Sequence, residues 1–388
     1  MEMSYDFSCP DRRGKSLKWD VNEDELPMWV ADMDFKTAPE VISALRERVE
    51  HGVFGYIDVP DEWYAAYIDW WKRRHGLTIE KEWLAFCTGV IPAISSLVRK
   101  FTTPNERVVI LTPVYNIFFN SIVNNGRKPL ECPLAYSNGE YDIDFDLLEK
   151  ALQQPQTTMM ILCNPHNPVG KIWDKETLAK IGELCYANGV TVISDEIHCD
   201  LTAPNEEYVP FALASEICKN ISITCVSPTK TFNLAGIQTS AIFIPNVHLR
   251  NRAIRAINTD EVAEPNVFAC LAATAAFNEG EKWLDELRAY LWKNRVYAEE
   301  FINENIPPLK AIVGKATYLL WIDLNGLKNQ PHASEIIRKE GKLVLNEGSS
   351  YGKAGEGFLR LNLATSFENL KEGLVRLKKS VDLIKSNR

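Results

Sequence analysis

The sequence predicts an α/β fold with a mostly parallel sheet, followed by a smaller α+β part. From residue 84 onward, short apolar runs alternate with helix-length amphipathic stretches. The runs are apolar on both faces, which is typical of parallel strands covered by helices on both sides. A chain of 388 residues is also long for one ordinary domain, so we expect two domains.

The elements of the larger part follow in chain order. The first forty-odd residues lack a long helical period and contain an extended segment at 26–35, which is typical of an arm. A helix is expected over 39–49, because Pro39 suits a first helical turn and the apolar positions have helical spacing. Buried strands are predicted at 108–111, 159–162, 190–193 and 221–226, with a helix over 175–186.

A long helical pattern at 281–305 marks the place where a second domain could be joined on. It contains no Gly or Pro. After it, strands are predicted at 316–324, 342–346 and 357–364, and a terminal helix near 369–384. The end of the chain is therefore expected to be α+β.

Composition and charge favour a small-molecule partner. The net charge of −9 offers no general attraction to nucleic acid or to an anionic membrane. The start of the chain lacks the pattern of a signal peptide, and no stretch approaches the roughly 18 apolar residues of a membrane span. We therefore expect a cytoplasmic protein. The nine Cys are scattered without a CxxC pair and the six His without ligand spacing, so neither disulfides nor a metal site is expected.

The strongest local feature is the run 190–200 (VTVISDEIHCD). It brings Asp195, Glu196 and His198 to the carboxyl end of a predicted strand, the edge where parallel α/β sheets bind ligands. Burying a carboxylate there is costly unless it meets a cation, such as a protonated ring nitrogen. The alternative for Asp195 is an acid that caps a helix or pairs with an Arg.

The next predicted strand leads into Ser227-Pro228-Thr229-Lys230 and so places a Lys at the same edge. A partly desolvated Lys amine can act as a nucleophile or base, although an isolated Lys of this kind is usually an ordinary surface residue. The tetrad also matches the S-x-x-K of penicillin-binding enzymes, with Tyr136-Ser137-Asn138 similar to their second motif. That motif should open a helix and be followed by K-T-G. Here it follows a strand and no K-T-G occurs, so we reject this interpretation.

Three further segments have the composition of ligand loops. Residues 88–92 (TGVIP) begin a helix whose free amides could hold a phosphate. Residues 163–170 (CNPHNPVG) follow the strand at 159–162, although such Asn-Pro turns also occur in purely structural loops. Residues 352–357 have the form GxxGxG but follow no clear strand, which favours a flexible loop over a dinucleotide site.

Together these motifs resemble the fold-type I enzymes that use pyridoxal 5'-phosphate, the aspartate aminotransferase superfamily, from Trp29 to Ala364. The resemblance implies a large domain with a mostly parallel seven-stranded sheet and a smaller α+β domain formed by both termini. The corresponding boundaries are 1–45 for the arm and part of the small domain, 46–285 for the large domain and 286–388 for the C-terminal small domain. It also implies a homodimer whose subunits share the active site.

The resemblance assigns roles to individual residues. Lys230 would form the Schiff base to the cofactor and later move a proton, Asp195 would pair with the pyridine nitrogen, and Asn167 would bind the ring 3-hydroxyl. Tyr115 would stack on the ring and count with Lys230 and Asp195 as catalytic. The other implied contacts to the cofactor are the amides of Val90 and Ile91, the Ser227 hydroxyl, His198, and Tyr56 of the partner subunit. Arg360 would clamp the substrate α-carboxylate with two hydrogen bonds, beside Ala31 and Asn167.

Two departures indicate a branch within the superfamily. Gln238 stands eight positions after Lys230, where many aminotransferases have an Arg, and His198 stands where they have a Tyr. With residues 29–35 (WVADMDF) and 227–233 (SPTKTFN), these features are similar to the cystathionine β-lyase or C-S lyase branch. The resemblance then implies elimination from an amino acid with a β-sulfur leaving group, giving a thiol, pyruvate and ammonia.

Two alternative functions accompany that expectation. An aminotransferase would use the same cofactor site and pass the amino group to an α-keto acid. A non-catalytic regulator of the same fold is disfavoured, because 388 residues leave no room for an added basic DNA-binding domain.

Overall fold

The computed structural model describes residues 3–327 and 332–386. Its largest element is a seven-stranded sheet in the order β2-β10-β9-β8-β7-β3-β4, of which only β10 runs antiparallel to its neighbours. The expected mostly parallel seven-stranded sheet is therefore confirmed. In chain order the strands are β2 (Leu84–Cys87), β3 (Arg107–Thr112), β4 (Lys128–Pro133), β7 (Thr157–Cys163), β8 (Thr191–Asp195), β9 (Ser222–Val226) and β10 (Ser240–Phe243).

Helices cover both faces of this sheet, because alternate strand residues point to opposite sides. Val108 and Ile110 of β3 belong to one buried cluster with side chains of α3, α4 and α10, whereas Val109 and Leu111 belong to another with side chains of α5, α6, α7 and α8. These helices are α3 (Val90–Phe101), α4 (Ile117–Val123), α5 (Phe145–Leu152), α6 (Lys175–Ala187), α7 (Phe211–Ala214), α8 (Glu216–Ile221) and α10 (Val247–Thr259). This arrangement explains why the strands are apolar on both faces.

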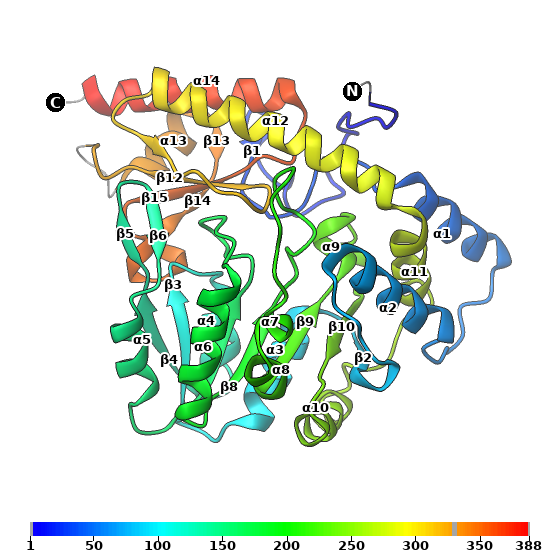
Figure 1. Cartoon of the computed structure of the whole chain (residues 1–388). Helices are drawn as coiled ribbons and strands as arrows, with labels where there is room; N and C mark the ends of the chain where they lie inside the picture. The colour runs from blue at the N-terminus through cyan, green and yellow to red at the C-terminus, as the bar shows by residue number, and fades with distance from the viewer. Residues whose placement is uncertain (1–2, 328–331, 387–388) are drawn as a thin grey trace.

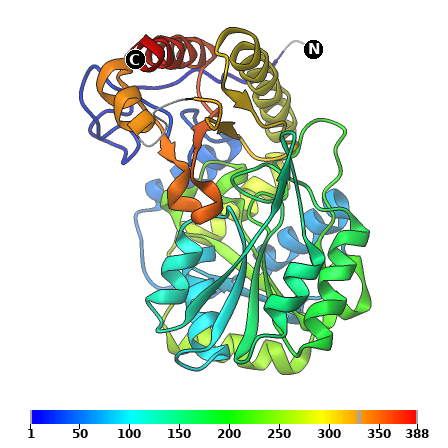
Figure 2. The same cartoon turned by 90° about the vertical axis from the view of Figure 1, so that its left-hand side faces the viewer.

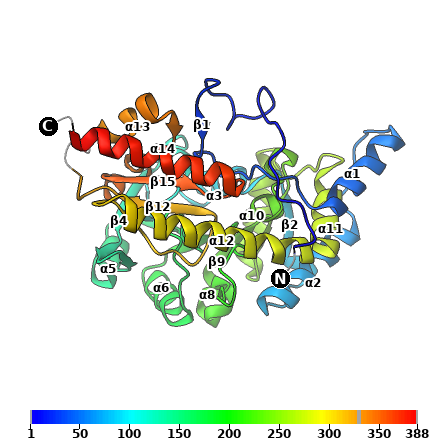
Figure 3. The same ribbon diagram turned by 90° about the horizontal axis from the view of Figure 1, so that it is seen from above.

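A second, antiparallel sheet lies above the first in Figures 1 and 2. Its order is β11-β12-β15-β14, with β11 (Lys310–Ala311), β12 (Leu319–Asp323), β14 (Asn346–Glu347) and β15 (Phe358–Asn362). Helices α12 (Glu281–Asn305) and α14 (Phe367–Ser386) run side by side across it, as Figure 3 shows from above. Helix α13 (Ala333–Gly341) packs against α14.

The N-terminal segment joins this second part rather than the large sheet. Strand β1 (Leu26–Pro27) pairs in parallel with β13 (Leu343–Val344). Met28 and Leu26 belong to the same buried cluster as side chains of α12 and α14. Residues from both ends of the chain thus build one core, as the resemblance implied. The boundaries at residues 45 and 285 remain a prediction.

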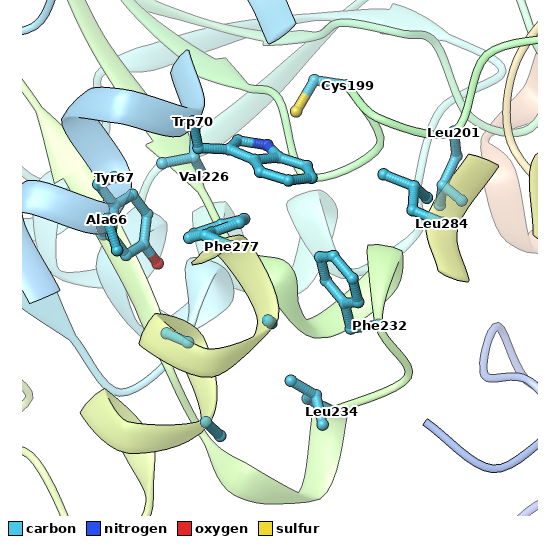
Figure 4. Close-up of a cluster of buried hydrophobic side chains, with 14 of the residues drawn as sticks. Ala66, Tyr67, Trp70, Cys199, Leu201, Val226, Phe232, Leu234, Phe277 and Leu284 are labelled. Carbon is cyan, nitrogen blue, oxygen red and sulfur yellow. The ribbon is translucent and has the colours of Figure 1, made fainter. Parts of the chain in front are cut away.

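Helices α1 (Pro39–His51), α2 (Asp61–His75) and α11 (Ala269–Glu279) pack together beside the large sheet. Their core is rich in aromatic rings: Figure 4 shows Trp70, Phe232 and Phe277 grouped together, with ring centroids of Trp70 and Phe232 5.9 Å apart. Phe232 lies two positions after Lys230. This core therefore supports the short helix that carries Lys230, which is α9 (Pro228–Thr231).

Several predicted elements are confirmed, and three expectations are corrected. Helix α12 matches its prediction to the residue, and α1 extends two residues beyond the predicted end. The segment 342–346 is not one strand but parts of two, because β13 pairs with β1 while β14 pairs with β15. The segment 352–357 is not an irregular loop throughout, since it contains a 3-10 helix at Lys353–Gly355, which follows another at Gly348–Tyr351.

The third correction concerns the S-x-x-K motif. Ser227 does open a helix, because its side chain accepts a hydrogen bond from Thr229 N and Pro228 occupies the first turn of α9. That ground for setting aside the penicillin-binding motif is wrong. The missing K-T-G still argues against it.

Candidate active site

A cavity of about 270 Å³ opens at the carboxyl ends of the parallel strands, between the large sheet and the N-terminal segment. This is the edge at which α/β sheets bind ligands. Eight of the residues predicted from the sequence line it: Ala31, Val90, Ile91, Tyr115, Asn167, Asp195, His198 and Lys230. The structure therefore brings most of the candidate site together.

Asp195 is the last residue of β8 and is buried. One carboxylate oxygen accepts a hydrogen bond from Ile197 N at 3.1 Å. Burial nevertheless raises the pKa of this carboxyl to about 7, against the opposing effects of that hydrogen bond and of Lys230. A cation placed in the cavity would favour the ionised form, in line with the cationic partner expected for a carboxylate at this edge.

Lys230 extends from α9 towards the N-terminal segment. Its Nζ donates a hydrogen bond to the Ala31 carbonyl oxygen at 2.5 Å. Burial, and then the nearby positive charge of Arg360, lower the pKa of the Lys230 amine to about 8, while Asp32 and Asp195 oppose the shift. At neutral pH an appreciable part of this amine is thus available as a nucleophile or base.

Arg360 lies on β15 of the second sheet, and its guanidinium reaches the large sheet. Nη1 donates to Asn167 Oδ1 at 3.3 Å, and Nη2 donates to the Trp29 carbonyl at 3.0 Å and to Asn346 Oδ1 at 2.9 Å. The residue is buried, and its Nε has no hydrogen-bond partner among the described residues. A buried guanidinium with a free donor is suited to binding a carboxylate.

The segment Thr88 to Pro92 forms the wall of the cavity at the start of α3. Gly89 precedes the helix and makes no side-chain cap, so the first N–H groups of α3 lack partners within the helix. Such a helix start attracts anions through its free amides and its dipole. The amides of Val90 and Ile91 are placed there, as predicted.

Ser227, Tyr56 and Arg360 are not on the wall of this cavity, although Arg360 contacts the wall residue Asn167. The Ser227 hydroxyl donates to the Thr239 carbonyl at 2.6 Å, while the neighbouring Thr229 does line the cavity. Tyr56 is fully exposed and lines a separate open groove with Phe54. Gln238 lines both the groove and the cavity, so the two hollows meet at that residue.

His198 follows β8 and is buried at the cavity wall. Burial, followed by the charges of Lys230 and Arg360, lowers the pKa of its imidazole to about 3. The ring is therefore neutral at ordinary pH. Its Nδ1 has no hydrogen-bond partner among the residues that the structure describes.

Sequence reasoning missed two groups beside Lys230. The hydroxyl of the buried Tyr318 donates to the same Ala31 carbonyl at 3.0 Å. The only sequence signal for Tyr318 was its place in a predicted strand, and the strand begins one residue later. The second group centres on the buried Asp200 carboxylate, which accepts hydrogen bonds from Thr231, Trp70 and His75.

The Asp200 group has the composition of a possible metal site, since His75, Cys199 and Asp200 offer ligand atoms within 4.8 Å of one another. Both carboxylate oxygens already accept hydrogen bonds: Oδ1 from Trp70 at 3.0 Å and His75 at 2.9 Å, and Oδ2 from Thr231 at 3.0 Å. These contacts tie Thr231, the neighbour of Lys230, to helix α2. The group therefore supports the helix that carries Lys230.

Comparison with known proteins agrees with this geometry. The chain matches the family described as aminotransferase class I and II over residues 24–377. It is 42% identical over 354 residues to cystathionine beta-lyase PatB of Bacillus subtilis (strain 168), covering 89% of this chain and 91% of that protein. It is 34% identical over 368 residues to protein MalY of Escherichia coli (strain K12), covering 92% of this chain and 93% of that protein.

Among solved structures, cystalysin from Treponema denticola, which contains a pyridoxal 5'-phosphate cofactor, superposes with a TM-score of 0.94 at 35% identity. That similarity covers 98% of this chain and 99% of cystalysin. The family match spans most of the sequence, and the matches to the relatives extend over nearly the whole length of those relatives. The chain belongs to the aminotransferase class I and II family.

Proposed function

We propose that this protein is a pyridoxal 5'-phosphate-dependent C-S β-lyase, which splits an amino acid with a β-sulfur leaving group into a thiol, pyruvate and ammonia. The observation that carries the proposal is the convergence of Lys230, Asp195 and Asn167 on the wall of one cavity, with Arg360 hydrogen-bonded to Asn167. The relatives named cystathionine beta-lyase and C-S lyase support the type of reaction.

The residues around the cavity fit this cofactor chemically. Asp195 is a buried carboxyl that favours a cationic partner such as a protonated pyridine nitrogen. The start of α3 can bind a phosphate through the amides of Val90 and Ile91. Lys230 offers an amine of lowered pKa for covalent attachment to an aldehyde.

The remaining cofactor contacts follow from the same assignment. Asn167 would bind the 3-hydroxyl, Tyr115 would stack on the ring, and the neutral His198 would also contact the cofactor. Ser227 keeps its predicted role at the phosphate, although its hydroxyl lies against Thr239. Thr229 lines the cavity and is an additional hydroxyl for the same phosphate.

When bound, pyridoxal phosphate supplies an electron sink for the negative charge left on the substrate α-carbon. Arg360 binds the α-carboxylate, and its contact with Asn167 fixes the guanidinium relative to the cofactor site. The Lys230 amine removes the α-proton at Nζ. With the cofactor bound, Asp195 would be ionised and would favour the protonated form of the pyridine nitrogen.

The proposed reaction breaks the α-carbon–hydrogen bond and the β-carbon–sulfur bond. The sulfur leaves as a thiolate and is protonated to the thiol. The remaining three-carbon enamine takes up water and yields pyruvate and ammonia, so no keto acid or redox partner is consumed. An aminotransferase would instead need an α-keto acid to complete its cycle.

Two observations favour elimination over amino transfer. Gln238 lies on the cavity wall where many aminotransferases carry an Arg, and His198 replaces their Tyr. Curated relatives named as lyases are up to 42% identical over most of the chain, whereas two curated relatives named as aminotransferases, from Thermococcus litoralis and Pyrococcus abyssi, are 25% and 24% identical. A solved structure titled as a putative aminotransferase, from Clostridium difficile 630, is 39% identical. Amino transfer stays the alternative function.

We further propose a cytoplasmic homodimer in which Tyr56 of the partner subunit reaches the phosphate. The exposed Phe54 and Tyr56 line an open groove that meets the cavity at Gln238, which supports a shared site. Within residues 3–327 and 332–386, no helix is long and apolar enough to span a membrane.

The reaction is tested by incubating the purified protein with cystathionine or an S-alkylcysteine and no keto acid. Pyruvate and free thiol should form in equal amounts, and Lys230→Ala should form neither. The lyase proposal is wrong if neither product appears while amino transfer from the same substrate to an added α-keto acid is rapid.

A further inference from the structure

The Ala31 carbonyl oxygen accepts hydrogen bonds from two side chains. Lys230 Nζ donates to it at 2.5 Å and the Tyr318 hydroxyl at 3.0 Å. The donors come from different parts of the fold, α9 of the large part and the segment just before β12 of the second sheet. The candidate base is thus hydrogen-bonded to an oxygen that it shares with a tyrosine.

The position of this carbonyl is fixed from both sides. Asn362 Nδ2 donates to the Val30 and Asp32 carbonyls, each at 2.6 Å, and so brackets Ala31. One residue further on, Met33 N donates to Asn233 Oδ1 at 3.0 Å. The carbonyl therefore cannot turn away from Lys230 without breaking hydrogen bonds to buried groups.

We propose that Tyr318 is a positioning residue that shares the Ala31 carbonyl with Lys230 and thereby weakens the hold of that oxygen on the protonated amine. This inference rests on the proposed function, in which Lys230 must release and accept a proton. Tyr318 would favour the unprotonated form of the Lys230 amine without contacting the reacting carbon.

The physical reason lies in the two protonation states of Lys230. A carbonyl oxygen binds an ammonium more strongly than a neutral amine, because the charged hydrogen bond is the stronger one. A second donor on the same oxygen occupies part of its acceptor capacity. Tyr318 therefore destabilises the ammonium form of Lys230 relative to the neutral amine, and burial has the same effect.

Tyr318 remains a donor throughout the working pH range. Burial, and then the negative charge of Asp32, raise the pKa of its hydroxyl far above the usual value. Replacing Tyr318 by Phe removes the donor but no charge. The groups that set the charge around Lys230, namely Asp32, Asp195, Arg360 and the neutral His198, stay in place.

The direct test measures the amine itself in the full-length chain without cofactor. Lys230 is modified with a small amine-reactive reagent over a range of pH, and the modified peptide is quantified by mass spectrometry. Tyr318→Phe should move the midpoint of Lys230 reactivity upward by about half a pH unit, since one neutral hydrogen bond is lost. Tyr136→Phe is the matched control, because its hydroxyl donates to Asp323 and lies outside the cavity.

A second variant reverses the expected sign. Replacing Tyr318 by 3-fluorotyrosine makes the hydroxyl a stronger donor, so the midpoint should move downward. In the holoenzyme, Tyr318→Phe should shift the acidic limb of the pH profile of kcat upward and leave KM nearly unchanged, because Arg360 is untouched.

An unshifted midpoint in both Tyr318 variants overturns the inference, and so does an equal shift in Tyr136→Phe. The modification assay does not depend on lyase activity. If the midpoint shifts as stated but no thiol is released from any β-thio amino acid, the inference about Tyr318 stands and the proposed reaction fails.

Discussion

Arg360 Nη1 donates a hydrogen bond to Asn167 Oδ1 at 3.3 Å across 193 positions of sequence. Arg360 belongs to β15 of the second sheet, and Asn167 to the turn after β7 of the large sheet. The proposed substrate site therefore lies at the junction of the two parts. Its geometry depends on how the N-terminal segment and the C-terminal part pack onto the large sheet.

Arg360→Ala should lower kcat/KM by about 100-fold or more, because it removes a charged, two-pronged partner of the α-carboxylate. Arg360→Lys should fall in between, since it keeps the charge and loses the planar fork. Steady-state kinetics measure both. Arg252→Ala, which changes an exposed Arg on α10, serves as the control. Equal values for Arg360→Ala and wild type would refute the assignment.

Asp195→Asn should change how the stability of the cofactor-free chain depends on pH. The pKa of Asp195 is raised from 3.8 to about 7 in the folded chain, so the folded state holds this proton more tightly than the unfolded state. The contribution of Asp195 to stability is present at low pH and is lost as pH rises through about 7. Asn does not titrate. The Tm of the variant relative to wild type should therefore rise by a few °C between about pH 4 and about pH 8.

The same comparison isolates Asp195 from its neighbours. Glu196 also has a pKa raised to about 7 by burial, but it is present in both proteins and its effect cancels in the difference. A Tm difference that is independent of pH would mean that Asp195 is not desolvated as described.

Gly170→Ala should destabilise the fold more than Gly126→Ala. Both glycines have positive φ, +71° and +75°, so both variants incur the backbone cost of that conformation. A Cβ at Gly170 would also lie 2.9 Å from the Ala316 carbonyl, whereas nothing lies within 4 Å of one at Gly126. Chemical denaturation should show an additional loss of about 1–3 kcal/mol at Gly170. Equal losses would show that the 163–170 turn and the 314–316 segment can move apart without a loss of stability.

Tyr56→Phe and Lys230→Ala should complement each other when mixed. Each mixed dimer would hold one site with both native residues, since Lys230 comes from one subunit and Tyr56 from its partner. Random exchange should restore about a quarter of wild-type activity per chain, because half of the dimers are mixed and each has one intact site. Sedimentation should give a dimer. An active monomer, or a mixture without recovered activity, would contradict a shared site.

The residues at the carboxyl edge of the large sheet can be predicted from sequence, because their positions follow from the alternation of apolar strands and amphipathic helices. Apolar strands covered on both faces are typical of parallel sheets, and parallel strands deliver the residues that follow them to one edge. Strand β10 is apolar and buried as well, yet it runs antiparallel. Periodicity alone therefore brings Asp195, Asn167 and Lys230 to the same edge. The helix at 281–305 is predicted to the residue because neither Gly nor Pro interrupts its pattern.

Contacts that depend on loop conformation cannot be predicted in this way. The Ala31 carbonyl meets Tyr318 only because the chain turns at Thr317, which has a φ of +68°, and because Asn362 brackets the N-terminal segment. The segment 342–346 is predicted as one strand because Leu343, Val344 and Leu345 form a continuous apolar run. Their separate pairing with β1 and β15 depends on long-range packing.

The most direct test of the central claim is to locate the cofactor on the chain. The holoenzyme is reduced with borohydride, digested and mapped by mass spectrometry, and the visible absorbance of the unreduced protein is compared with that of Lys230→Ala. The account predicts a pyridoxyl group on the peptide containing Lys230 and loss of the visible band in the variant. A pyridoxyl group on another lysine, or an unchanged band in Lys230→Ala, would contradict it.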